Sequence, residues 1–227
     1  MDVQMIDSEI LANRGFAVTR GLLAPAECAA LAALWPDKAR FRSHVVMQRH
    51  GYGQGEYKYF NYPLPERIEE LRQALYPELA TLANRWNEQL GITKRFPPTL
   101  QGWLKQCHAG GQKRPTPLLL RYGPGDYNCL HRDLYGELVF PLQATVLLSD
   151  PTKDFSGGEF MLVEQRPRMQ SRGEVVPLKQ GDAVIFSVNQ RPVKGTRGFH
   201  RTAMRHGVSS LHHGERFTLG IIFHDAA

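Results

Sequence analysis

The chain has 227 residues, 42% of them hydrophobic and 22% charged, and a formal net charge of +6. This composition is typical of a globular protein with its own core, and it argues against a disordered or membrane-spanning chain. Three cysteines without a C-x-x-C pair do not indicate a disulfide framework, and the acidic first residues lack a signal-peptide pattern. We therefore expect a cytoplasmic protein without a membrane or obligate protein partner. Its positive charge modestly favours nucleic acid as a partner.

The first 116 residues are expected to form a mainly helical region that belongs to the same domain as the rest. Patterning predicts a short strand at residues 15–19 and helices at residues 24–34, 66–90 and 99–109. Pro77 interrupts the second of these helices, so two helices or one kinked helix are expected there. Thr99 is a suitable N-cap for the third.

Between residues 41 and 62 the sequence resembles a hairpin around a three-glycine turn. Four tyrosines and a phenylalanine within eleven residues are interleaved with Arg49, His50 and Lys58. This segment is a candidate aromatic and cationic surface. It is equally well explained if half of the rings simply pack in the core.

From residue 117 onward, short apolar runs alternate with turns rich in glycine, proline and aspartate. Strands are expected at 118–122, 138–148, 159–164, 174–177, 183–187, around His206 and at 216–223. Seven or eight strands that follow helices predict an α+β fold: a double-stranded β-helix, or jelly-roll, core at 117–227 with the N-terminal helices packed outside.

A metal site is indicated by His131 and Asp133, which follow the Pro-Gly turn after the first of these strands. Residues two apart on an extended chain point to the same side, so an imidazole and a carboxylate can converge there. His206 is a suitable third ligand from the C-terminal part of the chain. Two histidines and one carboxylate with open positions are typical of non-haem Fe(II) and oxygen chemistry.

Arg216 follows His206 by ten residues and opens the last strand. If it lies one strand across from His206, its guanidinium faces a point beyond the metal, where it could bind a carboxylate in bidentate fashion. Three other histidines compete with His206 for the ligand role: His200, His212 and His213. The last two are expected in an exposed turn before Gly214.

An ordered set of short motifs runs through this half of the chain. They are Arg121-Tyr-Gly-Pro-Gly125, His131-x-Asp133, Gly157-Gly-Glu-Phe160, Gly181-Asp-Ala-Val-Ile-Phe186, and His206 with Arg216 ten residues on. With them, residues 117 to 224 resemble the 2-oxoglutarate- and Fe(II)-dependent oxygenases. The sequence is most similar to the branch that contains the AlkB-like nucleic-acid dealkylases, with prolyl 4-hydroxylases as more distant relatives.

The resemblance implies roles for six residues and a requirement for Fe(II), 2-oxoglutarate and O2. His131, Asp133 and His206 would bind iron, Arg216 would bind 2-oxoglutarate, and Tyr122 and Thr218 would contribute hydroxyl groups beside it. The chain departs from the AlkB-like pattern at two positions. Leu120 stands where many of those enzymes carry an asparagine that holds the cosubstrate, and Ile222 stands in place of a second arginine.

Three functions fit these features. The first is oxidative dealkylation of nucleobases in alkylated DNA, with aromatic residues stacking an extruded base and cations following phosphates. Candidate substrate contacts are Arg49, His50, Tyr57, Tyr59, Arg191, Lys194 and Arg197. The second is hydroxylation of a peptide residue or a small metabolite by the same iron chemistry. The third is a barrel that binds a ligand without catalysis, which would require the motif set to be fortuitous.

Overall fold

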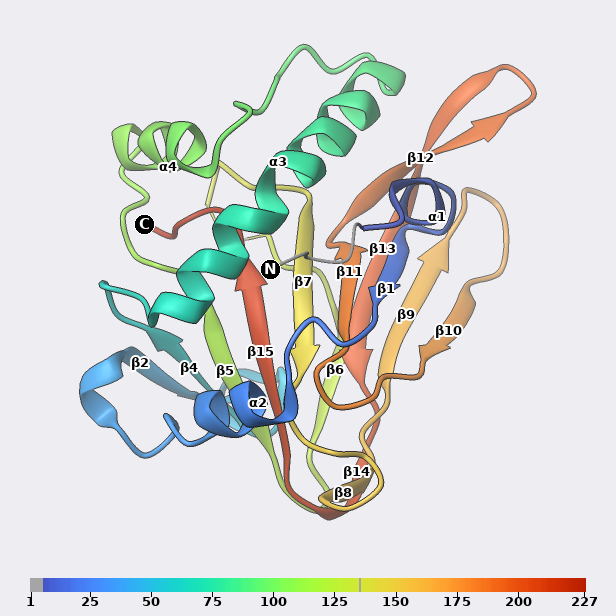
Figure 1. Cartoon of the computed structure of the whole chain (residues 1–227). Helices are drawn as coiled ribbons and strands as arrows, with labels where there is room; N and C mark the ends of the chain where they lie inside the picture. Colours follow the sequence, from blue (N-terminus) through green and yellow to red (C-terminus); the bar gives the residue numbers. More distant parts are fainter. Residues whose placement is uncertain (1–5, 135) are drawn as a thin grey trace.

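The computed structural model describes residues 6–134 and 136–227 (Figure 1). Two antiparallel sheets face each other, and helices cover the outer side of the larger one. The predicted α+β class with a jelly-roll core and outer helices is confirmed. Because helices cover one face of the larger sheet and the second sheet covers the other, its inner strand β7 (Leu142–Leu147) is buried at every position.

The larger sheet has seven strands. Their spatial order is β1 (Phe16–Thr19), β11 (Ala183–Ser187), β7, β15 (Arg216–Ile222), β5 (Leu118–Tyr122), β4 (Glu56–Phe60) and β2 (Phe41–Val46). Three of these strands come from the first 116 residues, so the N-terminal region extends the sheet of the C-terminal half. The predicted strands at 15–19 and in the 41–62 hairpin are therefore present as members of one sheet.

The smaller sheet carries the remaining long strands. Its order is β10 (Arg172–Val176), β9 (Phe160–Gln165), β13 (Gly198–Val208), β6 (Tyr127–His131) and β3 (Gly53–Gln54), while β12 (Gln190–Gly195) pairs with β13. A short pair is formed by β8 (Phe155–Gly157) and β14 (Leu211–Gly214). His212 and His213 thus lie in a strand rather than in a turn, although both are exposed as expected.

Four α-helices pack outside the larger sheet. They are α1 (Ser8–Arg14), α2 (Pro25–Ala32), α3 (Glu66–Gln89) and α4 (Leu100–Ala109), with 3-10 turns η1 (Lys38–Arg40) and η2 (Met47–His50) between them. The sequence analysis missed α1, a seven-residue helix capped by Asp7. Thr99 caps α4 as predicted, because its hydroxyl accepts from the backbone N–H of Gly102. No helix within the described residues is long and apolar enough to cross a membrane.

Of the two alternatives expected at Pro77, the structure excludes two separate helices, since α3 is one helix from Glu66 to Gln89 with Pro77 inside it. Pro77 and Gln73 lie on the exposed face of this helix. Water can therefore hydrate the Gln73 carbonyl, which lacks the N–H partner that a residue other than proline would supply. The opposite face buries apolar side chains against the outer face of the larger sheet.

A buried ion pair ties α3 to the end of the chain. Arg72 and Asp225 are both fully buried, and the Arg72 guanidinium donates to the Asp225 carboxylate at 2.8 Å and to the carbonyl of Ile222 at 2.9 Å. His108 on α4 and Tyr62 also contact that carboxylate. The helical layer and the last strand are therefore held together by polar contacts as well as by apolar packing.

Candidate metal and cosubstrate site

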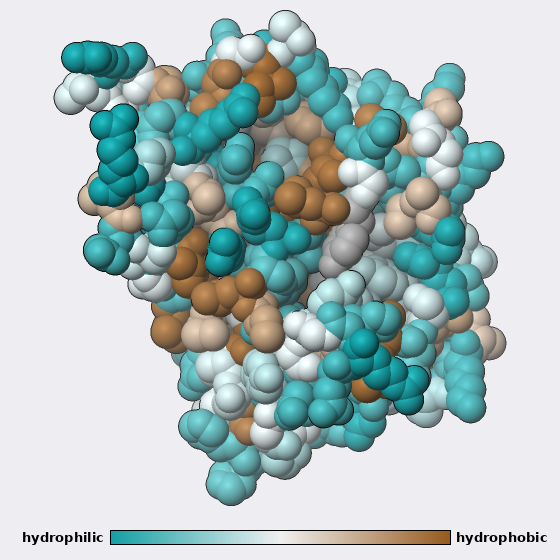
Figure 2. All heavy atoms as spheres, turned by 180° about the vertical axis from the view of Figure 1, so that it is seen from behind, coloured by the Kyte–Doolittle hydropathy of each residue, from teal (hydrophilic) through white to brown (hydrophobic). Residues whose placement is uncertain are grey.

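The inner faces of the two sheets enclose a cavity of about 380 Å3. β15 contributes Arg216, Thr218, Gly220 and Ile222, which are alternate residues on one face of the strand. The smaller sheet contributes His131 and His206 from the opposite wall. The molecule is hollowed on the face seen in Figure 2, where hydrophobic and hydrophilic side chains both border the hollow.

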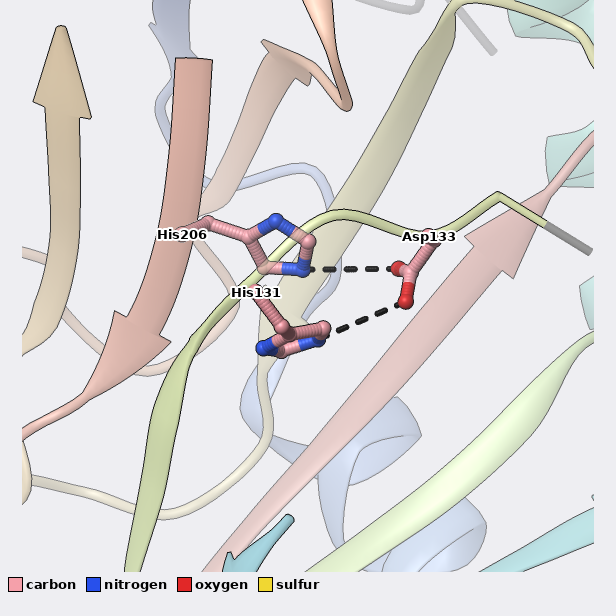
Figure 3. Close-up of side chains that lie close together, drawn as sticks. All are labelled: His131, Asp133 and His206. Carbon is pink, nitrogen blue, oxygen red and sulfur yellow. Dashed lines mark ion pairs between the residues drawn. The ribbon is translucent and has the colours of Figure 1, made fainter. Parts of the chain in front are cut away.

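Three potential metal ligands converge in this cavity. Ligand atoms of His131, Asp133 and His206 all lie within 4.8 Å of one another. His131 and His206 are register partners on β6 and β13, and Asp133 follows in the segment after β6. Figure 3 shows both imidazoles turned toward the carboxylate. Nε2 of His131 lies 3.3 Å from one carboxylate oxygen, and Nε2 of His206 lies 3.4 Å from the other.

The protonation chemistry of this group suits a cation. Burial would raise the pKa of Asp133, but His206 and His131 outweigh it and hold that pKa well below its ordinary value, so the carboxylate is charged. Nδ1 of His131 lies 2.7 Å from the carbonyl oxygen of Cys129. A carbonyl can only accept, so Nδ1 carries a proton and Nε2 is the nitrogen that faces Asp133. Burial would lower the pKa of His131, but the hydrogen bond and charge attraction to Asp133 raise it, which favours a proton between Nε2 and the carboxylate, in the position that a metal ion would take.

His206 is enclosed by aromatic rings. Its imidazole lies 4.6 Å from the Phe186 ring centroid and 6.1 Å from that of Phe160. Burial lowers the pKa of His206, which favours the neutral form that can bind a metal. Two imidazoles and one carboxylate on a rigid frame fit a 2-His-1-carboxylate iron site.

Arg216 lies at one end of the same cavity, but not where the sequence analysis expected it. It does not lie one strand across from His206; it projects from the larger sheet, which faces the sheet of His206. Its side chain is 2% exposed, and neither Nε nor Nη1 has a hydrogen-bond partner among the described residues. Burial lowers its pKa only to about 10, so it is a buried cation at neutral pH without a partner anion. Such a group is suited to an anionic ligand.

Tyr122 and Thr218 surround this cation. Tyr122 is the register partner of Arg216, and the guanidinium carbon lies 5.6 Å from its ring centroid. Thr218 is 1% exposed and lines the cavity two residues along β15. The structure thus brings together all six residues that the sequence analysis assigned to the metal and the cosubstrate.

The structure places some of the candidate substrate residues in the cavity and others outside it. Tyr57 and Tyr59 line the cavity, with their ring centroids 5.4 Å apart. Arg49 and His50 are exposed in η2, and the His50 ring stacks on that of Tyr52, another cavity residue, at 5.3 Å. Lys58 is buried instead and donates to the carbonyl oxygen of Trp35. It is therefore excluded from the predicted cationic surface.

The basic segment from Arg191 to Arg205 is a hairpin of β12 and β13 that projects from the body (Figure 1). Lys194 and Arg197 are exposed at its far end. The prediction that Arg191 contacts the substrate is wrong, because its side chain is buried and forms an ion pair with Glu164. A guanidinium so placed stabilises the sheet and is not available to a phosphate.

The sequence pattern did not predict four polar residues among those that line the cavity: Asn128, Arg132, Gln143 and Thr145. Strict alternation places Asn128 on the side opposite to His131. A β-bulge between the pairs His206–His131 and Val208–Asn128 changes this phase, so both residues reach the cavity. The same bulge leaves Cys129, two residues before His131, exposed. No local signal in the sequence marks the bulge.

Comparisons with known proteins agree with this site. A family model described as "Oxygenase, catalysing oxidative methylation of damaged DNA" matches residues 55–226. Two uncharacterized proteins from strains of Mycobacterium tuberculosis are each 53% identical over 168 residues, covering 74% of this chain and 72% of theirs.

Solved structures share the fold at low sequence identity. A prolyl 4-hydroxylase of Pseudomonas putida is 15% identical, with 94% of each chain covered and a TM-score of 0.55. An oxidoreductase of the 2OG-Fe(II) oxygenase family from Burkholderia pseudomallei is 15% identical, with 97% of this chain and 91% of that chain covered and a TM-score of 0.54. The family match, the fold and the His-Asp-His group agree, and the chain belongs to the Fe(II)- and 2-oxoglutarate-dependent oxygenases, in the family described as acting on damaged DNA.

Proposed function

We propose that this enzyme oxidatively removes alkyl groups from nucleobases in DNA. The observation that carries the proposal is the pairing of a buried His-Asp-His group with aromatic side chains in one cavity, in a chain whose family description names damaged DNA. A base extruded from a helix needs flat apolar surfaces for stacking, and Tyr52, Tyr57 and Tyr59 offer them.

In this proposal His131, Asp133 and His206 hold Fe(II), and Arg216, Tyr122 and Thr218 hold the distal carboxylate of 2-oxoglutarate. When bound, iron, 2-oxoglutarate and O2 supply the oxidising chemistry: one oxygen atom enters the substrate C–H bond, the other enters succinate, and CO2 is released. An N-methyl group hydroxylated in this way becomes an N-hydroxymethyl group, which breaks down to formaldehyde and the free base.

The protein's own part is to place and isolate the reactants. Phe160 and Phe186 pack against His206 and exclude water from one side of the metal group. Tyr57 and Tyr59 would stack the base, and the exposed cations Arg49, Lys194 and Arg197, with the exposed ring of His50, would contact phosphates. Arg191 is left out of this set because it is buried.

The test is product analysis on a substrate panel. Purified enzyme with Fe(II) and 2-oxoglutarate is incubated with oligonucleotides that carry single N-methylated bases, with the same oligonucleotides unmodified, and with peptides and free metabolites. The proposal requires formaldehyde and repaired base only with methylated DNA, in amounts equal to the succinate formed above the DNA-free background. Asp133→Ala serves as the inactive control.

The rival activity is hydroxylation of a peptide residue or small metabolite. It requires succinate without formaldehyde and a stable hydroxylated product from one of those substrates. Such a result, with no turnover of any methylated oligonucleotide, would replace the dealkylase proposal and leave the iron and cosubstrate assignments in place.

A further inference from the structure

Asn128 lies at the Arg216 end of the cavity. Its Nδ2 is 3.4 Å from the Tyr122 hydroxyl oxygen, and both residues line the cavity together with Arg216. Tyr122 and Arg216 belong to the larger sheet, whereas Asn128 belongs to the smaller one. The amide of Asn128 therefore reaches this end from the wall opposite to the cation.

The backbone fixes Asn128 between two glycines on the flanking strands. A Cβ at Gly207 on β13 would lie 2.7 Å from the backbone oxygen of Asn128, and a Cβ at Gly53 on β3 would lie 2.4 Å from that of Tyr127. Real side chains do not tolerate such contacts, so both strands approach β6 closely only because they carry glycine there. The bulge beside this point turns the Asn128 side chain into the cavity.

The hydrogen-bond roles around Tyr122 follow from the donor groups. An amide nitrogen can only donate, so the Tyr122 oxygen accepts from Asn128. The phenolic proton must then point to another acceptor, and none is found among the described residues. Burial raises the pKa of Tyr122 to about 12, so the proton is present at neutral pH. The adjacent Arg216 also has donors without partners.

We propose that Asn128 is a positioning residue for the cosubstrate: its amide orients the Tyr122 hydroxyl so that the phenolic proton is donated to the carboxylate held by Arg216. With this role, Asn128 would supply the amide that AlkB-like enzymes often carry at the position of Leu120. In this chain the amide comes from β6 on the facing sheet and acts through Tyr122.

The inference rests on the proposed role of Arg216 and is independent of the alkylated substrate. The experiment is calorimetric titration of 2-oxoglutarate into the protein loaded with Mn(II), which binds the same ligand set without turnover. Asn128→Leu should weaken 2-oxoglutarate binding about five- to tenfold, the effect of one hydrogen bond between neutral groups. Mn(II) affinity should not change. Asn61→Leu, the same substitution at an exposed site outside the cavity lining, is the matched control.

A double-mutant cycle distinguishes positioning from direct contact. If Asn128 acts through the phenol, Asn128→Leu should have no further effect in a Tyr122→Phe background. Additive losses would overturn the proposal, as would unchanged binding in Asn128→Leu. Moving the amide, in the double variant Asn128→Leu with Leu120→Asn, should recover part of the affinity.

Asn128→Asp gives a second test if the leucine variant does not fold. Its carboxylate would accept the phenolic proton and turn it away from the ligand, so binding should fall further than with leucine; wild-type affinity in this variant would contradict the proposal. Arg216→Lys distinguishes a wrong assignment of the cosubstrate site from a wrong assignment of Asn128 alone. If it also binds normally, the cosubstrate site itself is misassigned; if it binds weakly while Asn128 variants bind normally, only Asn128 is misassigned.

Discussion

At the scale of single residues, the cavity combines groups that are costly to bury without ligands. The carboxylate of Asp133 and the guanidinium of Arg216 are 7% and 2% exposed, on opposite walls. Charges buried to this extent need compensation, and here the two imidazoles compensate only the first. A metal ion and a carboxylate ligand would satisfy both ends of the cavity at once.

The assignment of His206 as a metal ligand can be tested against His212, one of the alternative histidines considered for that role. His206→Ala removes one of three ligand atoms and should lower Mn(II) or Fe(II) affinity by more than about 100-fold, beyond the effect of losing an outer partner. His212→Ala removes an exposed imidazole on β14 and should leave it unchanged. Metal affinity is measured by titration calorimetry. Equal affinities for the two variants would transfer the ligand role away from His206.

Arg216→Lys keeps the positive charge but loses the planar fork. We expect the 2-oxoglutarate concentration needed for half-maximal turnover to rise roughly 10- to 100-fold, because an ammonium cannot make two parallel bonds to one carboxylate. Metal affinity should stay close to that of the wild type. The check is a cosubstrate titration of succinate release; an unchanged requirement would place the carboxylate site elsewhere.

The sequence allowed the convergence of His131 and Asp133 to be predicted, because short spacing on an extended chain determines which side chains share a face. His206 was assigned from its motif context and the family resemblance. The sequence could not predict the wall from which Arg216 projects, since ten residues can span either a neighbouring strand or the gap to the facing sheet. The sequence also could not predict which way the side chains of Asn128 and Cys129 point. A sequence-based prediction assumes strict alternation along a strand, and one bulge reverses that alternation here.

At the scale of elements, the hairpin of β12 and β13 has two distinct parts. At its base, Arg191 is buried against Glu164, and at its tip the cations are exposed. The sequence alone does not distinguish an exposed from a buried arginine in this Gly- and Pro-containing segment, so Arg191 was predicted as a substrate contact together with Lys194 and Arg197. Only the pairing of β13 with β9, which places Glu164 opposite Met204, reveals the difference.

Arg191→Ala should therefore act on stability. It leaves the Glu164 carboxylate buried without its main partner, and we expect a loss of about 3–5 kcal/mol in the free energy of unfolding, measured by urea denaturation at pH 7. Lys194→Ala, an exposed residue of the same strand, is the control and should change it by less than about 0.5 kcal/mol. A negligible effect of Arg191→Ala would mean that the pair does not stabilise the sheet.

The same pair gives a pH dependence of defined sign. Burial would raise the pKa of Glu164, but Arg191 and Arg166 lower it below its ordinary value in the folded protein. The carboxylate thus contributes stability above the unfolded pKa, and this contribution is lost as the pH falls through the folded pKa. The stability difference between wild type and Arg191→Ala should shrink as the pH is lowered below about 4.3, the ordinary glutamate pKa. A difference that is constant with pH would contradict the charge-based explanation.

At the scale of the whole molecule, the region matched by the family model, residues 55–226, includes α3, α4 and most of both sheets. The N-terminal strands and helices lie on the outside of this frame and extend it. The cavity is thus formed by the paired sheets, and the elements that bear exposed cations project from them. In the proposed function, this arrangement would separate the chemistry of the metal site from the electrostatics of substrate binding.

The hairpin begins beside the cavity. Arg132, a cavity residue, donates to the side chain of Asn189, which immediately precedes β12. A nucleic acid with one base in the cavity would pass the exposed cations Lys194, Arg197 and Arg201 if it followed the hairpin. Each phosphate that they neutralise makes binding weaken with salt by roughly 0.9 in log–log slope.

The triple variant Lys194→Ala, Arg197→Ala, Arg201→Ala should therefore bind a methylated oligonucleotide more weakly and with a salt slope reduced by about 1 to 3. Lys105→Ala with Lys113→Ala removes exposed cations from the α4 region and is the control, which should keep the wild-type slope. Slow 2-oxoglutarate turnover without DNA depends only on the iron site and should persist in both. Binding is measured by fluorescence anisotropy at several salt concentrations. If the triple variant keeps the wild-type slope, the hairpin does not contact the phosphates, and the exposed Arg49 and His50 of η2 become the next surface to test.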